Sequence, residues 1–152
     1  MSSSAMPEAL GLFPLTAAVT ARGHLSIGGC DAVDLAREYG TPLYVFDVAT
    51  IRQQCQEHRR AFASRYPAVD VLYAGKAYLG VGLARLIRDE GLGLDVVSGG
   101  EMHIAKVAGF PAQRVCFHGN NKSAEELGSA LDWGIGRIAV DNLHELGMLA
   151  TL

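Results

Sequence analysis

A repeating unit from residue 71 onward constrains the fold more than any other feature of the sequence. An apolar strand, a short turn and an amphipathic helix recur, and the strand starts are spaced 23, 21 and 23 residues apart, at Val71, Leu94, Val115 and Ile138. The intervening helices end at or near glycines, at Gly91, Gly109 and Gly134. Short, mostly apolar strands of this kind suit a parallel sheet that is covered on both faces.

Consecutive β/α units with right-handed crossovers build either an open doubly wound sheet or a (β/α)8 barrel. The chain has 152 residues and carries about four such units, whereas a barrel needs eight units and typically about 250 residues. The sequence therefore predicts an α/β fold that, if it is a barrel, contains about half of one. A half barrel exposes two unpaired sheet edges.

The residues before the repeat differ in character. Residues 1–22 are small and polar around a weak apolar run, and we expect them to form a flexible leader. Within residues 23–47, two strand-like stretches at 24–27 and 43–46 flank a short helix over 32–39.

From Val48 the strand-like pattern gives way to a helical period. One face of the predicted helix carries Ile51, Cys55, His58, Phe62 and Tyr66. Pro67 follows and ends it. Residues 48–152, this helix and the repeat together, are therefore expected to form one domain.

Composition and charge exclude several classes of function. The net charge is -3 and the pI is about 5.9, which gives no electrostatic footprint for nucleic acid. No stretch approaches the ~20 apolar residues of a membrane span, and the N-terminus lacks the basic start of a signal peptide. We therefore expect no nucleic-acid partner, no membrane association and a cytoplasmic location. The three cysteines and five histidines show no spacing typical of a disulfide framework or a metal site.

In either architecture a ligand binds where the strands end. These positions are polar and glycine-rich: Gly75-Lys76, Val97 to Gly100, His118 to Asn121, and Asp141-Asn142. No G-x-G-x-x-G or Walker-type loop is present, so a dinucleotide or P-loop nucleotide site has no support. Lys76 interrupts an uncharged stretch, and an amine there could form a Schiff base with a carbonyl compound. The alternative is a surface lysine that extends from the strand end into solvent.

Two carboxylates accompany this lysine in the sequence. Asp95 lies inside an apolar strand and needs a partner, which could be a cation at the site or a structural hydrogen bond from a loop. Glu101 has the spacing of a capping box with Ser98. Lys106 falls on the solvated side of the same predicted helix.

The segment after the third strand allows two interpretations. His118 ends that strand and precedes Gly119-Asn120-Asn121-Lys122, where backbone amides and a cation could meet an anion. Alternatively, the asparagines shape a turn and Ser123 caps the next helix in a box with Glu126.

Four segments in this order carry a resemblance. They are Gly40 to Asp47 (GTPLYVFD), Tyr73 to Ala77 (YAGKA), Gly93 to Glu101 (GLDVVSGGE) and His118 to Ser123 (HGNNKS). Together they resemble the diaminopimelate decarboxylases, a branch of the fold-type III decarboxylases that depend on pyridoxal 5′-phosphate. The resemblance covers residues 23 to 152.

The resemblance implies a (β/α)8 barrel that begins near residue 48 and carries pyridoxal 5′-phosphate. It further implies that residues 23–47 join a C-terminal β-domain, that Lys76 holds the cofactor as a Schiff base, and that Asp95 and Glu101 lie close to it. The implied reaction converts meso-2,6-diaminopimelate to L-lysine in a homodimeric enzyme.

The family's later barrel strands, phosphate-binding loop and substrate-binding groups have no counterpart in these 152 residues. We therefore expect the chain to be an N-terminal fragment that binds the cofactor poorly and does not decarboxylate by itself. Ornithine or arginine decarboxylase-like and alanine racemase-like enzymes are alternatives, and so is a non-catalytic binding or regulatory module.

Overall fold

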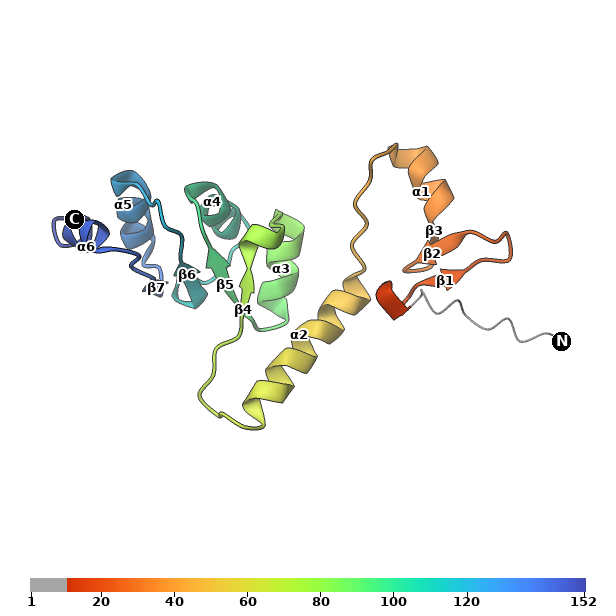
Figure 1. Ribbon diagram of the computed structural model, residues 1–152, viewed down its shortest axis with the longest axis horizontal. Helices are drawn as coiled ribbons and strands as arrows, with labels where there is room; N and C mark the ends of the chain where they lie inside the picture. Colours follow the sequence, from red (N-terminus) through yellow and green to blue (C-terminus); the bar gives the residue numbers. More distant parts are fainter. Residues whose placement is uncertain (1–10) are drawn as a thin grey trace. The chain divides into compact units, whose positions relative to one another are not determined.

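The computed structural model describes residues 11–152. The chain divides into two compact units, Met1–Gln54 and Cys55–Leu152, which are drawn from red to blue in Figure 1. Helix α2 (Val48–Ala63) contains the boundary between them. Each unit is described by itself.

The first unit contains a small antiparallel sheet. Strands β1 (Ala18–Val19), β2 (Leu25–Ile27) and β3 (Cys30–Asp31) pair in that order, and β3 leads directly into helix α1 (Ala32–Tyr39). The expected leader over residues 1–22 needs correction, because β1 pairs with β2 and Ala17 is buried. Residues 1–10 lie outside the described part of the chain.

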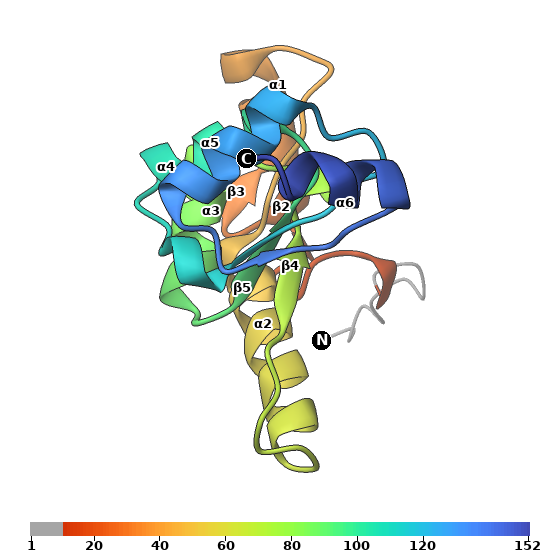
Figure 2. The ribbon, with the colours of Figure 1, turned by 90° about the vertical axis from the view of Figure 1, so that its left-hand side faces the viewer.

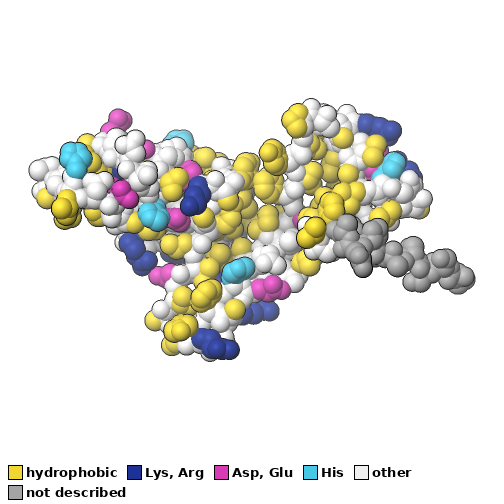
Figure 3. All heavy atoms as spheres, viewed as in Figure 1, with side chains coloured by type: hydrophobic (Ala, Val, Ile, Leu, Met, Phe, Trp, Pro, Cys, Tyr) yellow, Lys and Arg dark blue, Asp and Glu magenta, His cyan; other side chains and the backbone are white. Residues whose placement is uncertain are grey.

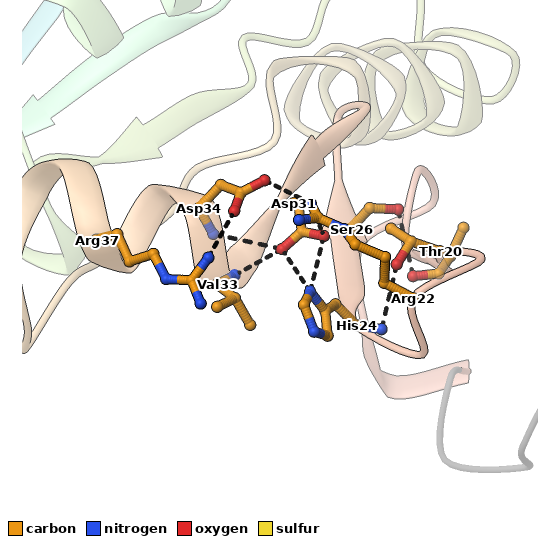
Figure 4. A network of polar contacts seen from close by, with 9 residues as sticks. Thr20, Arg22, His24, Ser26, Asp31, Val33, Asp34 and Arg37 are labelled. Atoms are coloured by element: carbon orange, nitrogen blue, oxygen red, sulfur yellow. Dashed lines mark hydrogen bonds and ion pairs between the residues drawn. The ribbon is translucent and has the colours of Figure 1, made fainter.

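A polar network fixes the junction between this sheet and α1 (Figure 4). Asp31 is the N-cap of α1 and accepts hydrogen bonds from the backbone N–H groups of Val33 and Asp34. The same carboxylate lies 2.8 Å from the Arg22 guanidinium and 3.0 Å from Nδ1 of His24. Burial opposes its ionisation, but these hydrogen bonds and the Arg22 charge outweigh burial and lower the pKa of Asp31.

The strand expected over residues 43–46 does not form. No strand in the described part of the chain pairs with this extended segment. The space-filling view shows many apolar side chains on the surface (Figure 3). The exposed apolar side chains include those of Leu43, Tyr44, Val45 and Phe46. A strand is defined by its hydrogen-bonded neighbour, so apolar alternation alone does not produce one.

Asp47 follows this segment and is the polar anchor at the start of α2. Its carboxylate accepts hydrogen bonds from the Thr16 and Thr50 hydroxyls and from the backbone N–H of Ala49. Led by the bond from Thr50, these contacts lower its pKa despite the opposing effect of burial. The predicted helix begins at Val48 as expected and ends at Ala63, before Tyr66.

The second unit is a parallel α/β layer, which confirms the predicted fold class (Figures 1 and 2). The strands β4 (Leu72–Ala74), β5 (Gly93–Val96), β6 (Val115–Phe117) and β7 (Arg137–Ile138) lie side by side in chain order. Helices α3 (Val81–Asp89), α4 (Gly99–Val107), α5 (Ala124–Trp133) and α6 (Leu143–Leu149) follow them in turn. Short 3-10 helices η2 (Gly75–Ala77) and η3 (Ala112–Arg114) follow β4 and precede β6.

The core lies between the sheet and its helices. Alternate strand residues are fully buried: Leu94 and Val96 of β5, and Val115 and Phe117 of β6. They meet the buried faces of the helices, formed by Ala84, Ile87, Met102, Ala105, Leu127 and Ala130. The opposite face of the sheet carries the intervening residues, among them Ala74, Asp95 and Cys116, which are neighbours in register.

Three successive helices end with the same hydrogen-bond pattern. Leu92, Phe110 and Ile135 each donate a backbone N–H to the carbonyl five residues earlier. The glycines that precede them, Gly91, Gly109 and Gly134, adopt φ of 80°, 69° and 71°. This is the Schellman motif, which needs a left-handed residue and therefore favours glycine. The glycine period of the sequence thus marks the turns back into the sheet.

Among the residues that the structure describes, no helix combines the length and the apolar character that would be needed to cross a membrane.

Candidate functional site

The predicted site residues lie at the carboxyl edge of the parallel sheet. Lys76 follows β4 directly in η2, Asp95 lies near the end of β5, and Glu101 is in the first turn of α4. Lys76 is exposed, and no hydrogen bond or ion pair joins it to another described residue. Its amine is therefore accessible at the edge where α/β proteins bind ligands.

Gly75 brings the Lys76 turn against both carboxylate residues. A Cβ atom at Gly75 would lie 3.0 Å from the Asp95 carbonyl oxygen and 3.0 Å from Oε2 of Glu101. The backbone immediately before Lys76 thus passes close to the main chain of Asp95 and to the carboxylate of Glu101. The structure brings these three predicted residues into one neighbourhood.

Glu101 is held by the end of its own strand-to-helix turn. Ser98 caps α4 by accepting a hydrogen bond from the Glu101 N–H at 3.2 Å. The return bond of the predicted capping box does not go to Ser98, because Oε2 of Glu101 accepts from the N–H of Val97 at 2.9 Å. The carboxylate therefore turns toward Gly75 while it stabilises the last residues of the β5 strand end.

Asp95 is a partly satisfied carboxylate. Its Oδ2 lies 3.6 Å from Nδ1 of His118, which is 61% exposed, while its Oδ1 is buried and has no hydrogen-bond partner within the described part of the chain. Cys116 is its neighbour on β6. Burial, followed by the negative charge of Asp95, raises the pKa of the Cys116 thiol. A buried carboxylate oxygen without a donor is costly, and it suits a site that receives a donor from a bound group.

The cation of the His118–Lys122 segment is not free to meet an anion. The Lys122 side chain is 1% exposed, and its Nζ lies 2.9 Å from Oε1 of Glu145. It also donates to the carbonyl oxygens of Gly119 and Ala139. The structural alternative is correct for the end of this segment, because Ser123 caps α5 in a full capping box.

Glu126 contributes a contact that the capping-box pattern did not predict. Its Oε2 accepts from the Ser123 backbone, while its Oε1 accepts from the N–H of Gly99 in α4 at 2.7 Å. The Ser123 bond, followed by the Gly99 bond, lowers the pKa of Glu126 against the effect of burial. One carboxylate thus links the starts of two consecutive helices at the edge that carries the site.

Sequence reasoning missed Glu145 and the burial of Lys122. Asn142 and Glu145 have the spacing of an ordinary helix cap, and Asn142 does accept from the Glu145 N–H at 2.9 Å. Nothing in that pattern indicates that the Glu145 carboxylate pairs with a lysine 23 residues earlier. Lys106 is exposed as expected and stacks over Trp133 at 5.2 Å from the ring centroid.

A cavity of about 830 Å³ lies at the opposite end of the strands. It is lined by residues where the strands begin and by the α2 segment, including Arg59, Asp70, Gly93, Arg114 and Arg137. Lys76, Asp95 and Glu101 are not part of it. Parallel sheets bind ligands at the carboxyl ends of their strands, so we expect the ligand site at the edge that carries Lys76 and not in this cavity.

Comparison with known proteins identifies the family of the chain. Residues 48–152 match the family model of the pyridoxal-dependent decarboxylases, pyridoxal binding domain. Diaminopimelate decarboxylase of Bacillus subtilis (strain 168) is 55% identical over 130 residues, which are 86% of this chain and 30% of that protein. Its counterpart from Methanothermobacter thermautotrophicus is 46% identical over 88% of this chain and 31% of that protein.

Solved structures show the same relationship. Diaminopimelate decarboxylase from M. jannaschii in complex with L-lysine matches with a TM-score of 0.79 and 33% identity, over 90% of this chain and 32% of that one. Lysine/ornithine decarboxylase from Vibrio vulnificus matches with a TM-score of 0.66 and 29% identity, over 78% of this chain and 32% of that one.

The parallel layer and the match over residues 48–152 identify sequence of a cofactor-binding enzyme domain. The chain belongs to the pyridoxal-dependent decarboxylases, and it contains sequence of their pyridoxal binding domain. It spans about a third of the length of the curated relatives it matches.

Proposed function

We propose that the chain carries the cofactor lysine of a diaminopimelate decarboxylase, which converts meso-2,6-diaminopimelate to L-lysine and carbon dioxide. The observation that carries the proposal is the contact of Gly75 with Asp95 and Glu101. This closeness places the turn that carries Lys76 near two carboxylate residues at the carboxyl edge of the sheet.

Each of the three residues has a role in this proposal. The exposed Lys76 amine binds the cofactor covalently through the cofactor's carbonyl carbon. Asp95 has a buried oxygen that lacks a donor among the described residues, and it supplies an acceptor for a protonated group nearby. Glu101 holds the Val97 N–H and keeps the Lys76 turn in place. When bound, pyridoxal 5′-phosphate supplies an electron sink for bond breaking at the α-carbon of an amino acid.

The similarity of the relatives supports this substrate over others. Curated diaminopimelate decarboxylases are 44–55% identical to the chain over 84–93% of its length. The arginine decarboxylase of Paramecium bursaria Chlorella virus is only 22% identical over 66% of the chain, which supports a shared fold and no substrate. The HGNNKS segment, which resembles the diaminopimelate branch, points the same way.

The lysine assignment is tested by covalent trapping. The purified chain is incubated with pyridoxal 5′-phosphate, reduced with borohydride and mapped by peptide mass spectrometry. We expect selective labelling of Lys76, abolished by Lys76→Ala and retained in Lys106→Ala, which removes another exposed lysine. Equal labelling of Lys76 and Lys106 would contradict the assignment.

The substrate assignment needs a separate measurement. Decarboxylation is followed as release of carbon dioxide and formation of L-lysine from meso-2,6-diaminopimelate, with ornithine and arginine as competing substrates. We expect no sustained turnover by the 152 residues alone, and selective turnover of diaminopimelate when they are joined to the remaining two thirds of a relative. A folded joined enzyme that did not turn over diaminopimelate would overturn the assignment.

The organisation of the domains and the assembly are part of the same proposal. Residues 48–152 would contribute to the pyridoxal-binding barrel, residues 23–47 would join a β-domain, and the joined enzyme would be a homodimer. Sedimentation equilibrium of the joined enzyme tests the last point. A cytoplasmic location stays a prediction from the sequence.

A further inference from the structure

Lys122 connects three segments that are separate in the sequence. Its Nζ donates to the carbonyl oxygen of Gly119 in the loop after β6 and to that of Ala139 after β7, and it pairs with Glu145 of α6. The ammonium also lies 5.7 Å from the centre of the Phe117 ring. With side-chain exposures of 1% for Lys122 and 3% for Glu145, this ion pair is shielded from water.

A buried ion pair is weak support for a purely stabilising role. Removing two charges from water costs several kcal/mol per ion, and a well-packed apolar pair is often as stable or more stable. The charged pair fixes positions instead, because a lysine ammonium has three N–H donors and can hold several acceptors in place at once. The acceptors it holds belong to consecutive loops at the edge that carries Lys76.

The loop held by Lys122 places His118. On one side, the His118 N–H donates to the Val96 carbonyl of β5 at 2.8 Å. On the other, Lys122 binds the carbonyl of Gly119, whose Cα is so close to Val97, the residue after β5, that a Cβ would lie 3.1 Å from the Val97 carbonyl oxygen. His118 is therefore clamped on both sides of its backbone, and its Nδ1 faces Asp95 at 3.6 Å.

We propose that Lys122 is a positioning residue, whose buried ammonium fixes the loop after β6 and thereby holds the His118 imidazole against Asp95. The inference rests on the proposed function, because it is the Lys76 site that gives the Asp95 carboxylate its importance. Lys122 itself touches neither Lys76 nor, in this proposal, the cofactor.

The test separates positioning from stability. In the isotope-labelled chain without cofactor, we expect a nuclear Overhauser effect between the His118 ring protons and the Asp95 β-protons. In Lys122→Met it is lost, and unfolding also becomes easier because Glu145 is left buried and unpaired. The double variant Lys122→Met with Glu145→Met removes both charges and recovers stability, yet the His118 signal stays absent because Gly119 and Ala139 have lost their donor. Lys106→Met, the same substitution at an exposed lysine, retains the signal.

Each outcome decides the proposal. Loss of the His118–Asp95 effect in a folded double variant supports it. Retention of the effect in a folded Lys122→Met chain or in the double variant overturns it, because stability alone would then account for Lys122. Failure of both variants to fold also overturns it, since the lysine would be required for the unit as a whole.

A second measurement tests whether the loop held by Lys122 affects the Lys76 site. Labelling of Lys76 by pyridoxal 5′-phosphate and borohydride is expected to fall several-fold in the folded double variant and to be unchanged in Lys106→Met. If labelling of the unmodified chain is not selective for Lys76, the lysine assignment of the proposed function fails, while the cofactor-free measurement still decides the role of Lys122. Unchanged labelling of Lys76 in the double variant would count against an effect of Lys122 on the Lys76 site.

Discussion

The Glu126 carboxylate of α5 accepts a hydrogen bond of 2.7 Å from the backbone N–H of Gly99, the first residue of α4. Gly99 has room for this contact because it lacks a side chain, and a Cβ there would lie 3.3 Å from both Cγ and Oε1 of Glu126. The first turn of a helix offers unpaired N–H groups and a partial positive charge. Glu126 accepts such hydrogen bonds at the starts of two helices at once, from Ser123 at its own helix α5 and from Gly99 at the preceding helix α4.

Replacing Glu126 with glutamine should reveal the charge in this contact. Because hydrogen bonds lower the folded-state pKa below the ordinary 4.5, the ionised carboxylate stabilises the fold above that pH, and this contribution is lost as the pH falls through the folded-state pKa. We expect Glu126→Gln to reduce the free energy of unfolding by about 1 kcal/mol at neutral pH and by progressively less in acid. Urea denaturation across this pH range measures it. An equal loss in Glu125→Gln, an exposed residue of the same turn, would show that the Gly99 contact has no special effect.

Asp31 should make the stability of α1, in the first unit, depend on pH. Its pKa is lowered from 3.8, so its stabilising effect on α1 is present above that pH and is lost as the pH falls through the lower, folded-state value. Asp31→Asn keeps the capping acceptor but removes the pairing with Arg22 and His24. We expect the backbone amide resonances of α1 to show fraying in this variant at neutral pH, as the unmodified chain shows only in strong acid. Indistinguishable spectra for the two chains at neutral pH would contradict this.

Two glycines should respond in opposite directions to the same substitution. A Cβ at Gly136 would lie 2.1 Å from the Gln113 carbonyl oxygen, and backbone cannot move aside as a side chain can. Gly136→Ala should therefore destabilise the second unit by roughly 2 kcal/mol or more. Gly128 lies within α5 and has nothing within 4 Å of its Cβ position, so Gly128→Ala should stabilise by roughly 0.5–1 kcal/mol. Thermal unfolding of both variants tests the difference in sign.

The three cysteines should differ in reactivity. Cys30 is exposed, whereas Cys55 and Cys116 are buried, and burial is the main cause of their raised pKa values. Because the thiolate is the reactive form, Cys30 should react first with a disulfide reagent in the native chain, and all three should react in urea. Peptide mapping after brief labelling identifies the site. Labelling of Cys116 as fast as Cys30 would mean that β6 opens readily.

The fold of the second unit was largely predictable from sequence because its determinants are local. Strand starts, helix starts at Ser98 and Ser123, and the glycines at helix ends all depend on residues a few positions apart. The segment 43–46 has equally good local character, but pairing requires a neighbouring strand, which no local pattern can supply.

The site was predictable in part. The strand ends placed Lys76 at the carboxyl edge of the sheet, and the resemblance implied that Asp95 and Glu101 lie close to it. In the structure both of these residues lie close to Gly75. The connection from Lys122 to Glu145 and the turn of Glu101 toward Val97 were not predictable. Both depend on which of several acceptors a side chain reaches, and that choice is made only after the loops have packed.

The strand order of the second unit has a consequence for how the chain is made. Each of β5, β6 and β7 pairs with the strand that precedes it in the sequence. Each new strand can therefore dock on one that has already left the ribosome, and the connection to be closed contains only one helix and its turns. The sheet can therefore form strand by strand during translation, because each strand pairs with the edge that the preceding strand has left open.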